Sequence, residues 1–434
     1  MRTLSRPLAG PRATSRTLAG TALAGLLVVL ATAGAAAAAG PTPTTEPALE
    51  PAAVSTEFAI GAANIAKPGN GGRTMWVSTQ GSDKHTYRTE WGGTKTVSRH
   101  LCLHRRDTDR ATCPPADAKH PLHTIQAAIL SALPGDVIVV RGGTYTEAVG
   151  WNATSGTAKK RIVLQSEPGA RVVLRGTLMM KKVSYWTVRG FHFLHDAGVQ
   201  GNGQAIVHMQ GGTGWVLTNN EIAGSPGVSN LMVTPGERTG STAARKAAGP
   251  HSYAIVRNCI RDNRGRHDHG MDHNIYLMAG VYSSGGRIER NLLAGAPNGA
   301  QIKVSASTWD TWADSPRNVR VRYNTMINGA AGVTVGVAAR NILIERNIVA
   351  NQVNGSRYDA AIKTWELERH DLTTVKSNYL AGYAQLYHQE PGEYLVKSGN
   401  VSAGRLSYVG SITGCTAKAA NAHVRETYGQ RADL

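Results

Sequence analysis

The 434-residue sequence is poor in aromatic residues and in cysteine. Aromatic residues make up 6% of the chain, and there are four Cys. No paired Cys spacing recurs, which argues against a structural zinc fold. Zinc-finger spacing, an aromatic RNA-recognition pair and a long basic helix are also lacking, so no nucleic-acid partner is expected. Beyond the first forty residues no apolar run is long enough to span a bilayer, so no stable membrane insertion is expected.

The beginning of the chain has the features of a secretory signal. A start with four Arg and no acidic residue precedes a run of small and apolar residues from Leu18 to Ala39. A membrane anchor is the alternative, but a Pro/Thr-rich stretch follows without a basic stop-transfer cluster. We therefore expect residues 1–39 to be a cleaved signal peptide, residues 40–73 to be a Pro/Thr/Gly-rich linker, and the mature protein to be secreted.

Positive charge remains in excess after the signal is removed. The formal net charge of +18 falls by the four Arg of the signal, to +14. A basic exported protein favours an acidic partner such as a polyuronate or a sulphated glycan, although solubility alone could account for the charge.

The four cysteines suit an oxidising compartment. Cys102 and Cys113 lie close together in a polar, Arg-rich segment, which predicts a loop-closing disulfide. Cys259 follows a repeated Asn, and we interpret it as a buried small apolar residue. Cys415 lies far away near the end of the chain, and the pairing of these two residues is left open.

Short β-rich runs recur along the chain with an Asn at one fixed place. The first of them reads Val216-Leu-Thr-Asn-Asn220-Glu-Ile222. The repeated residues are Asn220, Asn258, Asn291, Asn324, Asn347 and Asn378, with Gly190 in an earlier copy. Each run is expected to turn a corner at a left-handed residue, a conformation that Asn and Gly tolerate, and stacked Asn side chains would hydrogen-bond along the stack.

A single coil of this kind cannot bury its apolar side, so successive coils must stack into a solenoid. A β-propeller is the alternative, but its four-stranded blades need a longer and more regular period. The repeat therefore predicts an all-β solenoid.

Two segments near the start resemble the opening of pectate-lyase-like, right-handed parallel β-helix proteins. They read Met75-Trp-Val-Ser-Thr-Gln-Gly-Ser-Asp83 and Pro121-Leu-His-Thr-Ile-Gln-Ala-Ala-Ile129, and the resemblance continues from Pro134 to Glu147. It implies an all-β, right-handed parallel β-helix with a short N-terminal capping helix at Thr124–Leu133.

The resemblance also divides the chain. It spans residues 74–410, which we expect to form the β-helix domain. Residues 84–120 interrupt it as an insertion that contains the predicted disulfide. Residues 411–434 are expected to be a C-terminal cap or tail.

A second strand in each coil points apolar residues inward and polar residues outward. Alternation along the strand turns Ile275, Leu277, Ile302, Val304, Val333 and Val335 inward, and Ile362 and Leu386 extend this inner stack. The predicted outer column is Tyr276, Lys303, Thr334, Lys363 and Tyr387, flanked by Asn274, Gln301 and Trp365. Because successive strands lie about 4.8 Å apart, this column predicts a cationic and aromatic strip that would bind carboxylated sugars. An ordinary solvent-facing sheet is the alternative.

Two insertions are expected to wall this strip, Ser225–Ser252 and Ala306–Pro316. The second holds Trp309 and Trp312, which would clamp a sugar or cover the core of their own loop.

The stretch Arg264–His273 leads directly into the Tyr276 strand and holds three His and two Asp within seven residues. Asp268 and Asp272 are candidate metal ligands, with calcium as the candidate ion. The stretch could equally place His273 as an acid or base beside the strip, or form a polar loop without a catalytic role.

These features favour a polysaccharide lyase that acts on an anionic, uronic-acid-containing polysaccharide by β-elimination. Lys303 is the candidate base, with a pKa lowered by Lys363 and by desolvation. Tyr276 or His273 would supply a proton, and Arg322, Lys363 or calcium would hold the carboxylate.

In its strand position Lys303 resembles the lysine of β-helix enzymes of the chondroitinase-B and alginate-lyase type. That family places an arginine on the next coil, where this sequence has Thr334.

Two other functions are open to a protein of this fold. Glycoside hydrolases on this fold use clustered carboxylates, and the outer columns contain no Asp or Glu. A non-catalytic glycan-binding or cell-wall-binding protein could use the same strip, and it is the alternative to the lyase. A monomer is expected in either case.

Overall fold

The computed structural model describes residues 60–429, apart from residues 89–93, 105–113, 200–204, 268, 368–371 and 394, and it describes only the backbone of residues 87–88 and 309–311. The predicted signal peptide and most of the predicted linker lie outside the described residues. Cys113 and Asp268 lie outside them too. The predictions for these parts of the chain stay predictions.

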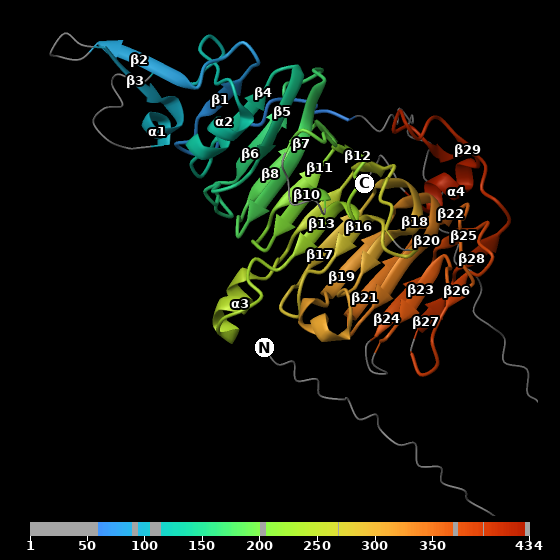
Figure 1. The fold of residues 1–434 in the computed structure, drawn as a ribbon. Helices are drawn as coiled ribbons and strands as arrows, with labels where there is room; N and C mark the ends of the chain where they lie inside the picture. The colour runs from blue at the N-terminus through green and yellow to red at the C-terminus, as the bar shows by residue number, and fades with distance from the viewer. Residues whose placement is uncertain are drawn as a thin grey trace, which may run out of the picture. The chain divides into compact units, whose positions relative to one another are not determined.

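Each coil contributes one strand to a parallel sheet of 11 strands. These strands are β1 (Thr74–Val77), β4 (Val137–Val140), β6 (Ile162–Ser166), β8 (Trp186–Arg189), β11 (Val216–Thr218), β14 (Ala254–Val256), β17 (Gly286–Glu289), β19 (Arg317–Arg322), β21 (Arg340–Glu345), β24 (Thr373–Lys376) and β27 (Leu395–Ser398). They pair in that order, so each coil lies beside the next one in the chain (Figure 1).

The remaining strands of the coils form a second parallel sheet of 15 strands. These are β5 (Gly143–Val149), β7 (Val172–Lys181), β9 (Phe191–Leu194), β10 (Ala205–Gln210), β12 (Glu221–Ala223), β13 (Ser229–Thr234), β15 (Cys259–Arg261), β16 (His273–Leu277), β18 (Leu292–Val304), β20 (Thr325–Gly336), β22 (Ile348–Ala350), β23 (Ile362–Trp365), β25 (Tyr379–Ala381), β26 (Tyr387–His388) and β28 (Val401–Ala403). The long strands β7, β18 and β20 pair with strands in both halves of this sheet, so it has two faces joined at a bend.

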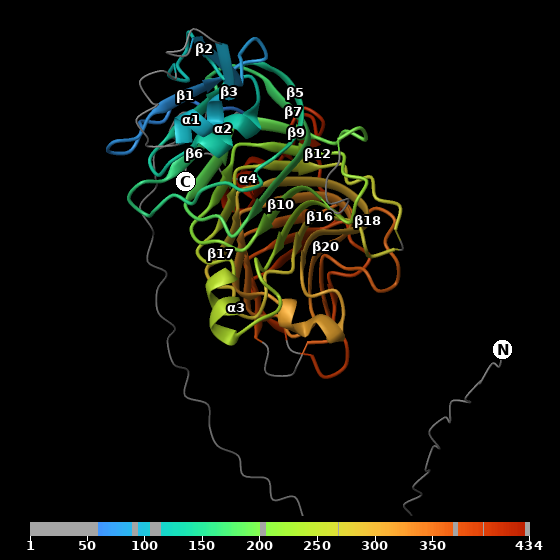
Figure 2. The same ribbon diagram turned by 60° about the vertical axis from the view of Figure 1, so that its left-hand side comes forward.

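The described chain is therefore all-β, with parallel strands stacked coil upon coil, as the repeat predicts (Figure 2). The right-handed sense of the coils stays a prediction. Short elements outside the coils are β2 (Lys84–Arg88), β3 (Thr94–Ser98), α1 (Arg99–His104), α2 (Ile125–Ser131), α3 (Thr242–Ala248), η2 (Trp309–Asp314), β29 (Tyr408–Val409), β30 (Lys418–Ala419) and α4 (Ala422–Thr427). Among the described residues, no helix has the length and apolar character needed to cross a membrane.

The predicted N-terminal helix is present as α2. Thr124 precedes it in an extended conformation, and its hydroxyl accepts a hydrogen bond from the N–H of Ala127 at 3.1 Å, as an N-cap does. The helix packs against β1, β4 and β5. Its role as the cap of the stack stays a prediction.

The repeated asparagines form a buried ladder inside the solenoid. The amide of Asn258 donates to Asn291 Oδ1 at 3.1 Å, that of Asn291 to Asn324 Oδ1 at 2.9 Å, and the pattern continues on the following coils. The ladder runs from Asn220 to Asn400, one coil further than the sequence predicts. Stacking of the Asn side chains is thus confirmed.

The left-handed residue of each corner is one position earlier than expected. Positive φ occurs at Asn219, Arg257, Arg290, Tyr323, Arg346 and Ser377, whereas the ladder Asn that follows each of them is not left-handed. Gly190 corresponds to Asn219, and Phe191 takes the ladder position of Asn220. The physical reason is that the left-handed residue makes the turn. The next residue then points its side chain into the coil, where an Asn amide hydrogen-bonds to the neighbouring backbone groups.

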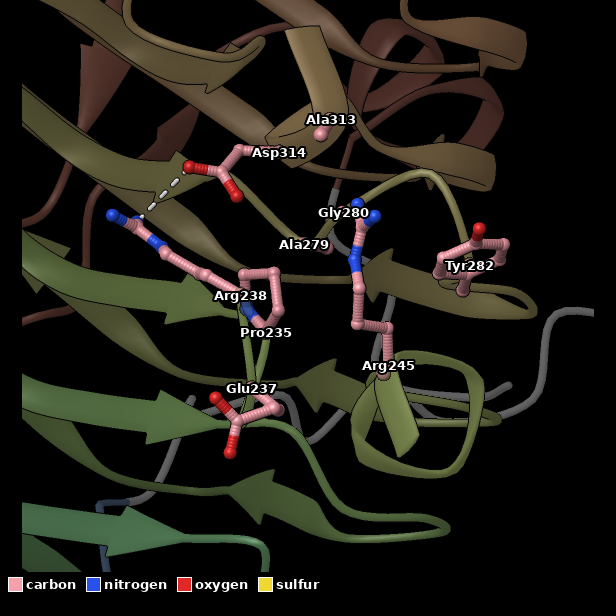
Figure 3. Close-up of a pocket in the computed structure, with 10 residues that line it drawn as sticks. Pro235, Glu237, Arg238, Arg245, Ala279, Gly280, Tyr282, Ala313 and Asp314 are labelled. Carbon is pink, nitrogen blue, oxygen red and sulfur yellow. Dashed lines mark ion pairs between the residues drawn. The ribbon is translucent and has the colours of Figure 1, made fainter. Parts of the chain in front are cut away.

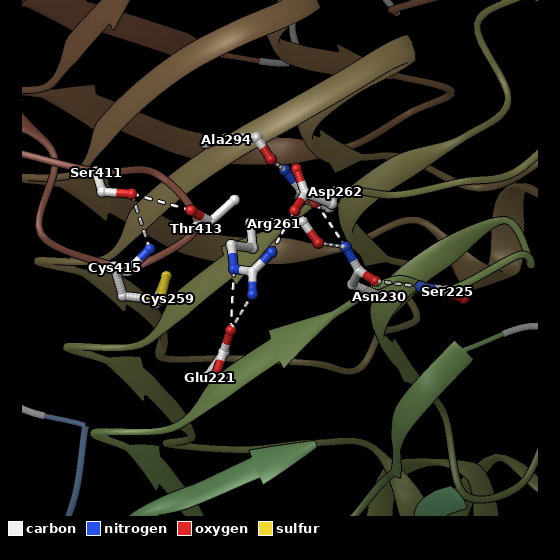
Figure 4. Close-up of polar contacts among 12 residues, drawn as sticks. Glu221, Ser225, Asn230, Cys259, Arg261, Asp262, Ala294, Ser411, Thr413 and Cys415 are labelled. Atoms are coloured by element: carbon white, nitrogen blue, oxygen red, sulfur yellow. Dashed lines mark hydrogen bonds and ion pairs between the residues drawn. A yellow bond between two sulfur atoms is a disulfide. The ribbon is translucent and has the colours of Figure 1, made fainter. Parts of the chain in front are cut away.

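The C-terminal segment packs against the outer face of the 15-stranded sheet. Leu406, Ala417 and Val424 join a buried cluster with Leu292 and Ile348 of the coils. A disulfide between Cys259 and Cys415 fixes this segment to β15 (Figure 4). The interpretation of Cys259 as a small apolar residue is therefore corrected: it is fully buried, as expected, but it is covalently paired.

Candidate active site

The outward-facing residues of β16, β18, β20 and β23 form one column. Backbone pairing places Tyr276 beside Lys303, Lys303 beside Thr334, and Thr334 beside Lys363. Three of them, Lys303, Thr334 and Lys363, line a cleft of about 270 Å³. The predicted column and its register are confirmed for these four residues, because the inner positions between them are fully buried.

The last position of the column is corrected. Tyr387 pairs with the inward-facing Ile362, and His388 pairs with Lys363 and lines the cleft. Tyr387 instead packs against the core. A shift of one residue exchanges the two faces of a strand, and β26 has only two residues, so its alternation was too short to fix the register.

Lys303 has a nearly buried amine, with 5% of the residue exposed. Its Nζ lies 4.9 Å from the centroid of the Tyr276 ring and 5.5 Å from that of Trp365. No carboxylate among the described residues pairs with it. Burial, together with the positive charge of Lys363, lowers the pKa of Lys303 to about 8.

Trp365 extends from the coil of Lys363 back toward Lys303. A Cβ at Gly336, which pairs with Trp365 on the neighbouring strand, would come within 2.2 Å of the indole Nε1. The absence of a side chain at Gly336 therefore lets the Trp365 ring lie across that strand. The ring covers Lys303 and also lines the cleft, where a sugar face could stack on it.

His273 lies at the start of β16 and lines the same cleft. Its Nδ1 accepts a hydrogen bond from the N–H of Ala300 at 3.0 Å, so the ring is neutral and carries its proton on Nε2. Burial, and then the charges of Lys303 and Lys363, hold the pKa of His273 well below its ordinary value. Its Nε2 is buried without a hydrogen-bond partner among the described residues. His273 is thus a hydrogen-bond donor rather than an imidazolium acid.

Tyr276 is largely covered. Its hydroxyl lies 3.4 Å from Ser307 Oγ, and burial raises the pKa of Tyr276 to about 12. The residue does not line the cleft, although its ring contacts Lys303.

Lys363 is held by Asp359, a residue that sequence reasoning missed. Its Nζ lies 3.5 Å from Asp359 Oδ1, while Asp359 Oδ2 accepts hydrogen bonds from His269 Nε2 at 2.5 Å and from Ser356 at 2.9 Å. Burial raises the pKa of Asp359, but these hydrogen bonds and the charge of Lys363 outweigh burial and keep the pKa below its ordinary value. A sequence signal existed: Asp359 leads into β23 as the His-rich stretch leads into β16.

Asn274 and Gln301 are corrected from substrate-binding to structural positions. Both are fully buried, and they continue a second amide ladder from Asn230. The Asn274 amide donates to Ala294 O at 2.9 Å and the Gln301 amide donates to Ile327 O at 2.6 Å. They lie where the sheet bends between its two faces, and the backbone groups there need these amides.

Arg322 is also corrected. It lies on β19 in the other sheet, where its Nε donates to Glu289 Oε1 at 2.7 Å, so it cannot hold a carboxylate in the cleft. A single Arg at the end of a short strand carries no signal in the sequence that tells which sheet it joins.

The predicted wall Ala306–Pro316 is only partly described at its two Trp residues. The side chain of Trp309 lies outside the described part of the chain. Trp312 is exposed in η2 and does not line the cleft, so its predicted role as a sugar clamp has no support from the cleft geometry.

The carboxylate of Asp272 is hydrogen-bonded within its own loop and to the next coil. It accepts hydrogen bonds from His267 Nδ1 at 2.6 Å and from the Asn298 amide at 3.2 Å. Among the described residues, no group of three or more His, Cys, Asp or Glu is arranged to hold a metal ion. The calcium prediction therefore gains no ligand set from the described side chains, and Asp268 lies outside them.

The cleft brings together an amine with a lowered pKa, an ammonium group held by a carboxylate, a neutral N–H donor and an indole. An amine whose pKa is near 8 is present as the free base in about a tenth of molecules at pH 7, enough to accept a proton. The ammonium of Lys363 and the N–H of His273 provide positive potential for an anion.

Comparison with known proteins gives structural neighbours only. No protein-family model and no curated protein matches the chain. Pectate lyase Pel9A is similar with a TM-score of 0.45 and 14% identity over 77% of each chain. An alginate lyase from Paenibacillus sp. str. FPU-7 has a TM-score of 0.39 and 17% identity over 64% of this chain and 95% of its own.

The cedar pollen allergen jun a 1 has a TM-score of 0.41 and 14% identity over 84% of this chain and 90% of its own. The fold assignment rests on the strand pairing described above.

Proposed function

We propose that this protein is a secreted polysaccharide lyase that cleaves a uronic-acid-containing polysaccharide by β-elimination, with Lys303 as the base. The observation that carries the proposal is the buried, unpaired amine of Lys303 on the floor of a cleft that also holds Lys363 and His273. Secretion is supported by the Cys259–Cys415 disulfide, a feature of oxidising compartments.

In the proposed reaction the neutral amine of Lys303 takes the proton from the sugar carbon next to the carboxylate. The electron pair left on that carbon forms a double bond to the neighbouring carbon, and the bond from that neighbour to the glycosidic oxygen breaks. The departing oxygen takes a proton and leaves as a hydroxyl. Atoms and charge balance without an oxidant or a second substrate.

Lys363 and His273 would act on the carboxylate. As the proton leaves, negative charge moves onto the carboxylate oxygens, and a cation or N–H donor placed there stabilises this charge. Lys363 is oriented by Asp359, and His273 is oriented by the N–H of Ala300, so both are held before substrate arrives.

Lys303 would also return the proton to the departing oxygen. The Tyr276 hydroxyl is the other candidate, but it is directed to Ser307 and does not line the cleft. His273 is neutral and its Nε2–H is a poor acid. The protonated Lys303 is therefore the group that the geometry favours for both transfers.

The test is the ultraviolet absorbance of the new double bond, followed on a panel of polyuronates and glycosaminoglycans with and without calcium. We expect one polymer to give a rise that falls by at least about a hundredfold in Lys303→Ala, the loss of a general base, with binding kept within a few fold. Lys376→Ala is the matched control, because Lys376 pairs with Glu345 at 3.3 Å on the other sheet.

No absorbance rise on any polymer, with saturable binding retained, would contradict the lyase. It would favour the glycan-binding alternative, in which Lys303 and Lys363 act only as charge partners.

A further inference from the structure

The cleft extends along the coils in one direction only from Lys303. The column positions on the next three strands, Thr334, Lys363 and His388, all line it. The two positions on the other side, Tyr276 and Met232, do not line it. Lys303 is therefore the first position of the column that lines the cleft.

The loop after β18 forms the end of the cleft. Ser307 lines the cleft, and its Oγ lies 3.4 Å from the Tyr276 hydroxyl and 3.3 Å from Met278 Sδ. Behind it, Val228 packs with Met232, Tyr276 and Met278 in a buried apolar cluster. The sheet surface beyond Lys303 is thus covered rather than open.

The two predicted wall insertions are joined to each other at this end. Arg238, from the insertion that contains α3, pairs with Asp314 at the end of η2 at 3.2 Å (Figure 3). Arg245 lies close by, with its guanidinium 5.3 Å from the centroid of the Tyr282 ring. The space that these residues leave is about 10 Å³, enough for about one water molecule and too small for a sugar.

We propose that this closed end makes the protein act on the ends of polysaccharide chains and release short products. The inference rests on the proposed lyase function and deepens it. From Lys303 to His388 the column spans three strand spacings, roughly 14 Å, which holds a short oligosaccharide. A polymer interior needs a groove open at both ends. Here a chain that runs along the column past Lys303 meets the loop of Ser307, so Lys303 would act close to a chain end.

The first test is the size of the products at the earliest measurable time. We expect short unsaturated oligosaccharides from the first turnovers, with little loss of polymer viscosity for each bond cleaved. A substrate whose two ends are coupled to bulky beads should be cleaved at a rate at least tenfold lower. Long oligosaccharides at early times, or unchanged cleavage of the blocked substrate, would overturn the proposal.

The second test removes the ion pair that joins the two insertions at the closed end of the cleft. In the double variant Arg238→Ala/Asp314→Ala the two insertions lose their ion pair, and the share of long early products should rise several fold. Lys376→Ala, which removes an ion pair away from the cleft, should leave the product sizes unchanged. Thermal unfolding of each variant confirms that the chain still folds. An unchanged product distribution in a folded double variant would contradict the role of this ion pair.

If no polymer gives an unsaturated product, binding measurements test the closed end of the cleft separately from the lyase function. That outcome contradicts the lyase, and the closed end is then tested by the affinity for saturated oligouronates of increasing length. A closed end predicts that affinity for one terminus stops rising after a short length and that bulky groups at both ends abolish binding. Equal affinity for blocked and free oligosaccharides would overturn the closed end.

Discussion

The amine of Lys303 is surrounded by aromatic rings and by groups that do not neutralise its charge. His273 is neutral, Tyr276 stays protonated because its pKa is raised to about 12, and Lys363 repels a second positive charge. This environment follows from a strand position that alternation predicts, and the sequence therefore identified the residue. Its amine lies against the rings of Tyr276 and Trp365, and the approach of Trp365 across the neighbouring strand is not specified by any local pattern.

The lowered pKa of Lys303 gives a prediction for the pH dependence of cleavage. The neutral amine is the active base, so kcat/KM should rise with pH and reach half of its plateau near the pKa of about 8. The measurement is the initial rate of double-bond formation at low substrate concentration across pH 6 to 10. A rate that falls as the pH rises through this range would contradict Lys303 as the base.

Replacing Lys363 should move this profile. In Lys363→Gln the positive charge that lowers the pKa of Lys303 is removed, so that pKa rises and the profile shifts toward higher pH. KM should also rise several fold, because a cation for the substrate carboxylate is lost. The measurement compares the pH–rate curves of this variant and of Lys376→Gln. A midpoint that stays in place or moves to lower pH in Lys363→Gln would contradict the effect of the Lys363 charge on the pKa of Lys303.

At the scale of the strands and corners, the Asn ladder is the feature that the sequence predicted best. Asn291 donates to Ile255 O at 2.9 Å and accepts from the N–H of Asn258 at 2.8 Å, so each rung satisfies backbone groups of its neighbours. The left-handed residue was misplaced by one position, since Asn tolerates both the turn and the inward site. Only the backbone angles distinguish these two roles.

The ladder should be sensitive to the loss of one rung. Asn291→Ala leaves a buried N–H and a buried carbonyl without partners, so the free energy of unfolding should fall by about 3 kcal/mol. Arg320→Ala, on the exposed side of β19, should change it by less than about 0.5 kcal/mol. Urea unfolding followed by circular dichroism measures the free energy of unfolding of both variants. Equal values would contradict the stabilising role of the Asn291 side chain.

At the scale of the whole described chain, the C-terminal segment is joined to the coils by the Cys259–Cys415 disulfide across a sequence separation of 156 residues. The segment covers the outer face of the sheet around Leu292 and Ile348. The sequence of this segment does not predict that it packs on the sheet, because its few apolar residues have no repeat that could be aligned with the coils.

Removing this disulfide should loosen the segment. In Cys259→Ala/Cys415→Ala the unfolded chain gains conformational freedom, and the free energy of unfolding should fall by about 2–4 kcal/mol. Limited proteolysis should then cut between residues 406 and 429 before the coils are cut. Wild-type protein under a reductant serves as the comparison. Protease resistance identical to that of the oxidised protein would show that packing alone holds the segment.

The solenoid and the column Tyr276–Lys303–Thr334–Lys363 could be predicted from the sequence, because repeated Asn residues and two-residue alternation are local patterns that backbone geometry must follow. The other features of the site depend on contacts between distant segments. The tertiary structure buried Asn274 and Gln301 in a second ladder, placed Arg322 on the other sheet and brought Asp359 to Lys363. It also closed the cleft beside Lys303. These outcomes depend on how insertions of different length fold over neighbouring coils, and contacts between distant segments leave no periodic signal in the chain.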